Sequence, residues 1–219
     1  MTGGLSTAGL TTARSGAKGA VRARLRLGVP RPAPALARIL VSGLRLLERE
    51  GAEIACATSF WAPPAALLFR RSVVEQIGGF RDDLSIIDDA RFLFDAAHCG
   101  ARFVHAPHLG AYYRVRPGSL SRRDPAKFWL DVLHNGEQIE ALWRARGKLD
   151  AAQLRAIGNI FDGTARSLFE ISHPSWRRAL AALERNHVVP SRKLRAARLI
   201  ASLLGDALAR RMVAVLAGG

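Results

Sequence analysis

The chain has 219 residues, of which 49% are hydrophobic and 23% charged, proportions typical of a globular protein with a sizeable core. Its two cysteines, Cys56 and Cys99, belong to no paired motif, which excludes a disulfide framework and favours a reducing compartment. No run of about 18 uncharged apolar residues is present, so the sequence predicts no membrane-spanning helix.

The net charge of +15 is distributed unevenly along the chain. Residues 1–47 hold eight basic and no acidic residues, residues 48–123 hold ten and nine, and residues 124–219 hold fifteen and nine. The charge therefore lies in a tail and a C-terminal region rather than on one compact docking face, which disfavours nucleic-acid binding. The N-terminus lacks the apolar segment of a secretory signal, so a cytoplasmic protein is expected.

Residues 1–34 are rich in Gly, Thr, Ser, Ala, Arg and Pro. Such a composition cannot bury enough apolar surface to order itself, and it predicts a disordered basic tail. Apolar residues then recur at helical spacing over residues 35–50, and Gly51 is a suitable stop. A first helix is therefore expected at residues 35–50.

Two short elements are predicted next. The continuous apolar run at residues 65–69 is typical of a strand buried on both faces. Ser72 and Glu75 have the spacing of a capping box, which predicts a short helix beginning at Ser72. Gly78 and Gly79 end this helix, because glycine adopts the left-handed conformation at little cost.

The acidic pair Asp88-Asp89 opens a second predicted helix, which ends at Gly100. Strands are expected at residues 102–105 and 110–115, because each is a short apolar run followed by proline. Together with the preceding elements, they predict a compact α/β region.

Beyond residue 124 the pattern is helical throughout. Helices are expected at about 125–146, 150–171, 174–186 and 191–216. The sequence therefore predicts three regions, which are a disordered basic tail at 1–34, an α/β domain at 35–123 and a helical appendage at 124–219.

A series of motifs runs through the α/β region in a fixed order. They are an apolar run ending in Arg-Arg, a Gly-Gly-Phe, an acidic pair, a glycine, a strand ending in proline, and Tyr-Arg-Val-Arg-Pro-Gly-Ser. They occupy Leu67–Arg71, Gly78–Phe80, Asp88-Asp89, Gly100, Phe103–Pro107 and Tyr113–Ser119. This order resembles the second, acceptor-side half of a family 2 glycosyltransferase. The resemblance covers about residues 50–123 and implies an α/β fold with a partial GT-A-like mixed sheet.

The resemblance also implies a reaction, the transfer of a hexosyl group from a nucleotide-sugar donor to a hydroxyl of a glycan or lipid-linked acceptor, with inversion. By this resemblance Asp89 is the general base, with Asp88 beside it. The substrate-binding candidates within the matching motifs are Gly78, Gly79, Phe80, Tyr113 and Arg116. Trp61 lies outside these motifs, and it either stacks on a sugar ring in such a site or is simply a buried core residue.

The acidic pair has a structural interpretation as well. Aspartate is common at the start of helices, and one residue can serve both as cap and as base. Two adjacent carboxylates raise each other's pKa, whereas a helix N-terminus favours the charged form. The sequence leaves open which effect prevails at Asp89.

Members of the family hold a divalent cation, Mg²⁺ or Mn²⁺, with an Asp-x-Asp motif in their first half. No aspartate precedes Asp82 here, and Arg116 stands where the family has a histidine. The resemblance therefore implies a divalent cation whose Asp-x-Asp ligands are absent from this sequence. The spacing of Cys99, His105 and His108 fits no common zinc site, so no residue is named as a metal ligand. A truncated transferase without a donor-binding half is therefore expected.

A second hypothesis is a non-catalytic interaction module that retains a remnant of the transferase. Residues 191–216 place Leu194, Ala197 and Ile200 at helical spacing among several arginines. Such a helix either packs its apolar stripe on the protein body or lies on an anionic membrane surface. Peripheral membrane contact through this segment is thus an alternative to a freely cytoplasmic protein.

Overall fold

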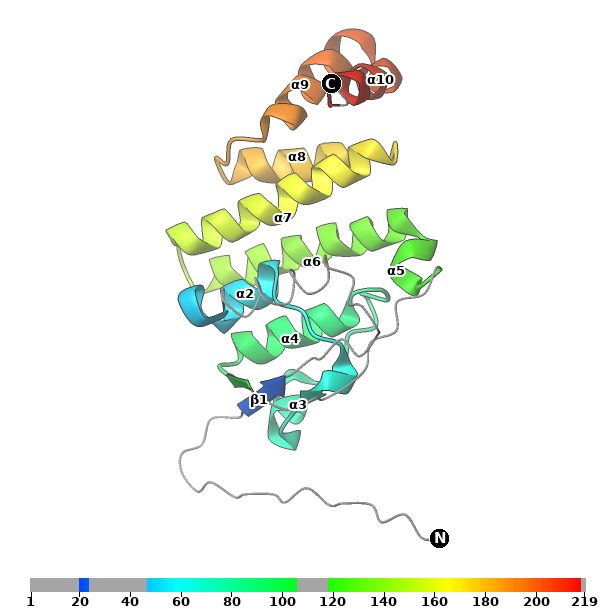
Figure 1. Cartoon of the computed structure of the whole chain (residues 1–219). Coiled ribbons are helices and arrows are strands. Elements are labelled where there is room, and N and C mark those ends of the chain that lie inside the picture. The colour runs from blue at the N-terminus through cyan, green and yellow to red at the C-terminus, as the bar shows by residue number, and fades with distance from the viewer. Residues whose placement is uncertain (1–19, 24–46, 106–117, 218–219) are drawn as a thin grey trace, which may run out of the picture.

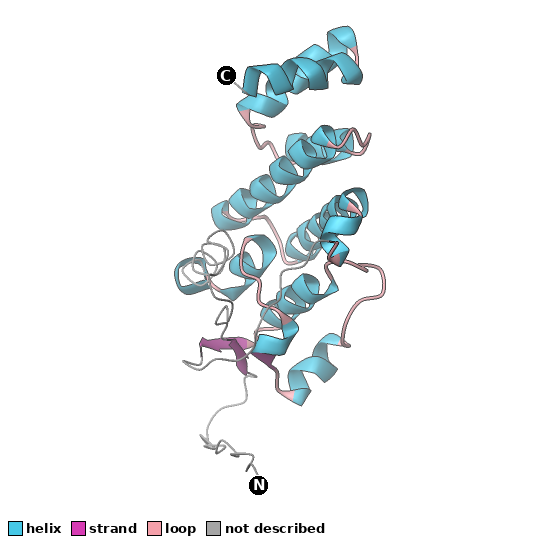
Figure 2. Ribbon diagram, turned by 45° about the vertical axis from the view of Figure 1, so that its right-hand side comes forward, coloured by secondary structure: helices cyan, strands magenta, loops and turns pink. Residues whose placement is uncertain are grey.

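The computed structural model describes residues 20–23, 47–105 and 118–217, and most of these residues are helical. The long helices are stacked in successive layers, from a small sheet at one end to the C-terminal helices at the other (Figure 1). The turned view places all strands at the same end (Figure 2).

Residues 47–50 are helical, and nine further α-helices follow along the described part of the chain. They are α2 (Ala52–Thr58), α3 (Arg71–Ile77), α4 (Asp88–His98), α5 (Leu120–Arg123), α6 (Pro125–Ala145), α7 (Ala151–Glu170), α8 (Trp176–Arg185), α9 (Arg192–Leu204) and α10 (Asp206–Ala217). The remaining elements are the 3-10 helix η1 (Pro64–Ala66) and the strands β1 (Ala20–Ala23), β2 (Leu67–Leu68) and β3 (Arg102–His105).

The three strands form one sheet in the order β2-β1-β3. Strand β1 runs antiparallel to β2, with Ala23 opposite Leu67, and parallel to β3, with Ala20 opposite Arg102. The sequence did not predict β1, which lies within the segment 1–34 that was expected to be disordered. The predicted strand at 110–115 lies outside the described residues.

The predicted fold class, an α/β fold with a partial GT-A-like mixed sheet, is wrong, because the described residues are mostly helical and their strands span four, two and four residues. The apolar run at 65–69 shows the physical reason. Pro64 opens a 3-10 turn, in which the Ala66 amide donates to the Pro63 carbonyl at 2.8 Å. Only Leu67 and Leu68 remain for pairing, and Leu68 is 67% exposed rather than buried.

The two short helices of this region are confirmed, but one of their predicted caps is wrong. Helix α3 ends at Gly78, which adopts the left-handed conformation with φ 76°. No side chain caps its start, and Glu75 accepts a hydrogen bond from Arg71 Nε at 2.8 Å instead of closing a box with Ser72. Helix α4 begins at Asp88, as the acidic pair predicts.

The helices beyond residue 124 largely follow their sequence signals. The Asp150 carboxylate accepts a hydrogen bond from the backbone amide of Gln153 at 2.8 Å. The Gln153 side-chain oxygen accepts one from the backbone amide of Asp150, so a full capping box begins α7. The single helix predicted at 191–216 is divided into α9 and α10 at Gly205, whose φ is 81°.

One hydrophobic core joins the predicted α/β domain to the helical appendage. The Phe94 ring on α4 meets the Trp143 ring on α6 with centroids 5.9 Å apart. The same cluster includes Ala55 of α2, Ile157 of α7 and Leu183 of α8, each fully or almost fully buried. The boundary at residue 124 stays a prediction, but the packing of the core is continuous across it.

None of the helices in the described ranges is both long enough and apolar enough to cross a membrane.

Candidate functional site

The acidic pair lies in the first turn of α4, where backbone amides lack partners within the helix. Asp88 Oδ1 accepts from the Asp89 amide at 2.9 Å, and Asp89 Oδ1 accepts from the Ala90 amide at 2.7 Å. The preceding residue, Ile87, contributes no side-chain cap. Both carboxylates therefore stabilise the start of the helix, which is the structural role that their sequence position indicates.

Trp61 lies beside Asp89 although the two residues are 28 positions apart in the sequence. The indole Nε1 donates to Asp89 Oδ2 at 2.8 Å, and both side chains are half-buried. The structure thus brings together the residue predicted as general base and the aromatic residue predicted to contact a sugar. Each carboxylate oxygen has two lone pairs, so Asp89 can still accept a further hydrogen bond from another donor.

Burial of Asp89 raises the pKa of its carboxyl above the usual aspartate value of 3.8. The hydrogen bonds from Trp61 and from the Ala90 amide lower this pKa, and the negative charge of Asp88 raises it. Burial is the largest of these effects and accounts for the raised pKa. Of the two effects that the sequence left open, the hydrogen bond from the backbone amide of Ala90 is larger than the effect of the Asp88 charge. A carboxylate with a raised pKa accepts a proton more readily than an ordinary surface aspartate.

Phe80 provides an exposed aromatic surface near the same helix. It follows Gly78 and Gly79, whose φ values of 76° and 85° turn the chain out of α3. Its ring is stacked on Phe92 of α4, with centroids 4.4 Å apart and planes 23° apart, yet the residue is 53% exposed. Phe92 is one helical turn beyond Asp89, so this aromatic surface and the acidic pair are neighbours on α4.

The other two predicted substrate-binding residues, Tyr113 and Arg116, lie outside the described residues.

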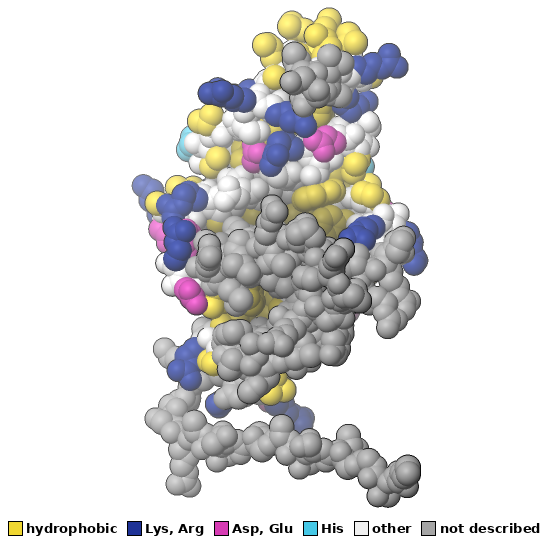
Figure 3. Space-filling model, viewed as in Figure 1, with side chains coloured by type: hydrophobic (Ala, Val, Ile, Leu, Met, Phe, Trp, Pro, Cys, Tyr) yellow, Lys and Arg dark blue, Asp and Glu magenta, His cyan; other side chains and the backbone are white. Residues whose placement is uncertain are grey.

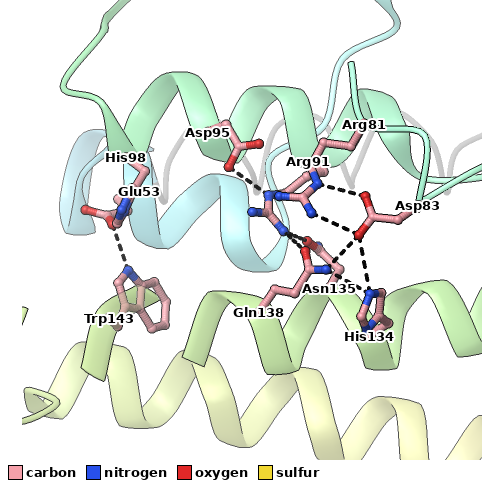
Figure 4. A network of polar contacts seen from close by, with 10 residues as sticks. All are labelled: Glu53, Arg81, Asp83, Arg91, Asp95, His98, His134, Asn135, Gln138 and Trp143. Atoms are coloured by element: carbon pink, nitrogen blue, oxygen red, sulfur yellow. Dashed lines mark hydrogen bonds and ion pairs between the residues drawn. The ribbon is translucent and has the colours of Figure 1, made fainter. Parts of the chain in front are cut away.

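A buried arginine that the sequence reasoning missed lies on α4, two residues after Asp89, and points toward side chains of α6 (Figure 4). Arg91 is only 2% exposed, and its Nε donates to Asp95 Oδ1 at 2.7 Å on the same helix. Its Nη1 donates to the side-chain oxygens of Asn135 and Gln138 on α6. The spacing of four between Arg91 and Asp95 was a sequence signal for this ion pair, but nothing in the sequence indicated the two amides.

The network continues from Gln138 to the loop before α4. Gln138 Nε2 donates to Asp83 Oδ2 at 2.8 Å, and Asp83 also accepts from Arg81 Nε at 2.8 Å. The hydrogen bond from Arg81, followed by that from Gln138, lowers the pKa of Asp83, which keeps the carboxylate charged. These contacts hold the loop before the acidic pair against α6.

A second polar cluster fixes the other end of α4 (Figure 4). Glu53 on α2 accepts from Trp143 Nε1 at 2.8 Å, and it lies 2.6 Å from His98 Nδ1 and 3.1 Å from Arg146 Nη1. This one carboxylate therefore joins α2, α4 and α6. With both ends of α4 held in this way, its first turn is a rigid support for Asp89.

The described residues do not fit the divalent cation that the family resemblance implies. Within the described ranges, no group of three or more His, Cys, Asp or Glu side chains converges as a metal site would require.

Comparisons with known proteins add no relative to this description: no protein-family model, no curated protein and no solved structure matches the chain.

Proposed function

We propose that this chain is the acceptor-side part of an inverting, family 2-like glycosyltransferase, in which Asp89 is the general base. In this role Asp89 takes the proton of an acceptor hydroxyl while that oxygen attacks the anomeric carbon of a nucleotide-sugar. The observation that carries the proposal is the contact between Trp61 and Asp89, because it joins the predicted base to an aromatic residue that was a candidate for stacking on a sugar ring.

Three features of the site support a role in proton transfer. The Asp89 carboxyl has a raised pKa because it is partly buried. The Trp61 indole holds one carboxylate oxygen in a fixed direction, which favours a single geometry of attack. The exposed ring of Phe80 offers a flat apolar surface of the kind on which the C–H face of a sugar packs.

The proposal also requires a binding site for the nucleotide-sugar donor, which is not assigned to any of the described residues. We infer that the nucleotide-sugar diphosphate, together with its Mg²⁺ or Mn²⁺ ion, is held by a part other than the described helices. The chain as described should therefore bind UDP- or GDP-sugars weakly, and micromolar binding in calorimetry would contradict this inference. The two cysteines, which form no disulfide, are consistent with the cytoplasmic location that we propose.

Replacing Asp89 with asparagine should lower sugar transfer by about a hundredfold or more, because asparagine keeps the shape but cannot accept the proton. Transfer of labelled sugar from a panel of nucleotide-sugars to glycan and lipid acceptors measures this effect. Asp88→Asn is the matched control, since it removes the neighbouring charge and leaves the base in place. Near-normal transfer by Asp89→Asn would rule out the base assignment.

Acceptor binding can be measured without turnover through the Trp61 indole N–H signal in NMR spectra. The chain has four tryptophans, and the spectrum of Trp61→Phe identifies the signal of Trp61. We expect glycans that serve as acceptors to shift this signal in the wild type and in Asp89→Asn alike. If no glycan shifts this signal, the proposed acceptor site at Trp61 and Asp89 is wrong.

A further inference from the structure

The C-terminal helices α9 and α10 carry two separate sets of apolar side chains. Leu194, Ala197 and Ala201 of α9 are buried against the body of the protein. A second set points outward, with exposed fractions of 40 to 73%, and consists of Leu199, Leu203, Leu204, Leu208 and Met212. Packing on the protein body and contact with a surface are therefore not exclusive for this segment, because apolar side chains on other positions of the same helices stay exposed.

The outward set is distributed over both helices of a hairpin at one end of the molecule. Leu199 and Leu203 are one turn apart on α9, and Leu208 and Met212 are one turn apart on α10. The chain turns at Gly205, so that α9 and α10 pack against each other. Hydrophobic side chains gather at this extremity of the molecule, with Lys and Arg side chains next to them (Figure 3).

The charge around this surface is positive. Asp206 is the one acidic residue in the segment 192–217, and it is turned toward α8, where Arg177 Nη2 lies 2.5 Å from its Oδ1. Lys193 pairs with Glu170 and Arg198 pairs with Glu184. Four further arginines have no described carboxylate within ion-pair distance. They are Arg192, Arg195, Arg210 and Arg211.

We propose that the α9–α10 hairpin docks on an anionic lipid bilayer, with its outward leucines and Met212 in the headgroup region and its arginines on lipid phosphates. Large aliphatic side chains flanked by arginine are the combination that binds such a surface. The helices have 13 and 12 residues, which is shorter than a membrane span requires. Two copies of a chain with net charge +15 repel each other, which argues against a second copy as the occupant.

Flotation of the full chain with phosphatidylcholine vesicles, with and without phosphatidylglycerol, tests this proposal. We expect binding to the anionic vesicles that weakens at high salt, and little binding to the neutral ones. The double variant Leu199→Asn/Leu203→Asn should bind roughly tenfold less tightly or worse, since it removes inserted apolar area. Its matched control is Leu68→Asn/Leu120→Asn, which changes two leucines of similar exposure away from the hairpin.

The contribution of the hairpin arginines to vesicle binding is tested by the same flotation assay. The triple variant Arg192→Gln/Arg195→Gln/Arg211→Gln should also lose roughly tenfold or more in affinity for anionic vesicles. A variant with the same net charge but with the changes elsewhere, Arg70→Gln/Arg102→Gln/Arg123→Gln, should bind nearly as well as the wild type. This control separates a local docking surface from the attraction of a highly basic chain to any anionic surface.

Three results would overturn the proposal. The first is that the wild-type chain does not bind anionic vesicles. The second is that the control variants lose as much binding to these vesicles as the hairpin variants do. The third is a wild-type dimer, detected by ultracentrifugation, that the leucine variant dissociates, because the surface would then be a contact between two copies. The proposal does not depend on the transferase function, since flotation requires neither donor nor turnover.

Discussion

Replacing Arg91 with alanine is expected to lower the free energy of unfolding by about 3 to 5 kcal/mol. The guanidinium is almost fully buried, and it holds the carboxylate of Asp95 and the amide oxygens of Asn135 and Gln138. The substitution leaves a mostly buried negative charge and two acceptors without their donor, which costs more than the pair itself contributes. Urea denaturation followed by circular dichroism measures the change.

A matched control for this prediction is present on α3. Arg71 and Glu75 have the same spacing of four and a similar distance of 2.8 Å, but their side chains are 90% and 62% exposed. Arg71→Ala should therefore cost less than about 0.5 kcal/mol, as is usual for an exposed pair. If Arg91→Ala lowers the free energy of unfolding by no more than Arg71→Ala does, burial does not increase the contribution of the Arg91 network to stability.

The second large effect is expected at Trp143, whose replacement by alanine should cost about 3 to 5 kcal/mol. This side chain is 1% exposed, packs on Phe94 of α4 and donates its indole hydrogen to Glu53 of α2. Trp143→Phe keeps most of the packing and removes only the donor, so it should cost about 1 kcal/mol. Trp129→Ala on the same helix is the control, because Trp129 is only partly buried and should cost less than Trp143→Ala.

Hydrogen exchange adds a structural readout to this prediction. Since Trp143 joins α6 to both α2 and α4, Trp143→Ala should lower the protection of amides in all three helices together. Loss of protection in α6 with unchanged protection in α4 would show that the regions before and after residue 124 unfold independently. That outcome would support the domain boundary predicted from the sequence.

Local signals predicted the helices well. Helix α4 begins at its acidic pair, and α3 ends at Gly78. Each of these signals depends on residues within one or two helical turns, so no distant partner is needed for the prediction. The break at Gly205 was missed because the apolar periodicity continues on both sides of it.

The sheet and the site depend on contacts between distant residues, and there the sequence was less informative. A short apolar run such as 65–69 cannot be told from a turn when its pairing partner is unknown, and this, together with the family resemblance, led to the wrong fold class. The burial of Arg91 requires amides 44 and 47 positions away on α6. The contact of Trp61 with Asp89 likewise spans 28 positions, and only Asp89 was named from the motif pattern, whereas Trp61 was one candidate for stacking on a sugar.

The most direct test of the proposed base is the pKa of Asp89 itself, measured by carbon-13 NMR titration of its carboxyl group, with Asp89→Asn to identify the signal. We predict a pKa above 3.8, and a further rise in Trp61→Phe, because that variant removes a donor that stabilises the charged form. A raised pKa also means that this carboxyl favours the folded state at low pH, and that its contribution is lost as the pH rises through the folded-state pKa. A pKa at or below 3.8 in both proteins would contradict the proposal and leave Asp89 with the role of a helix cap alone.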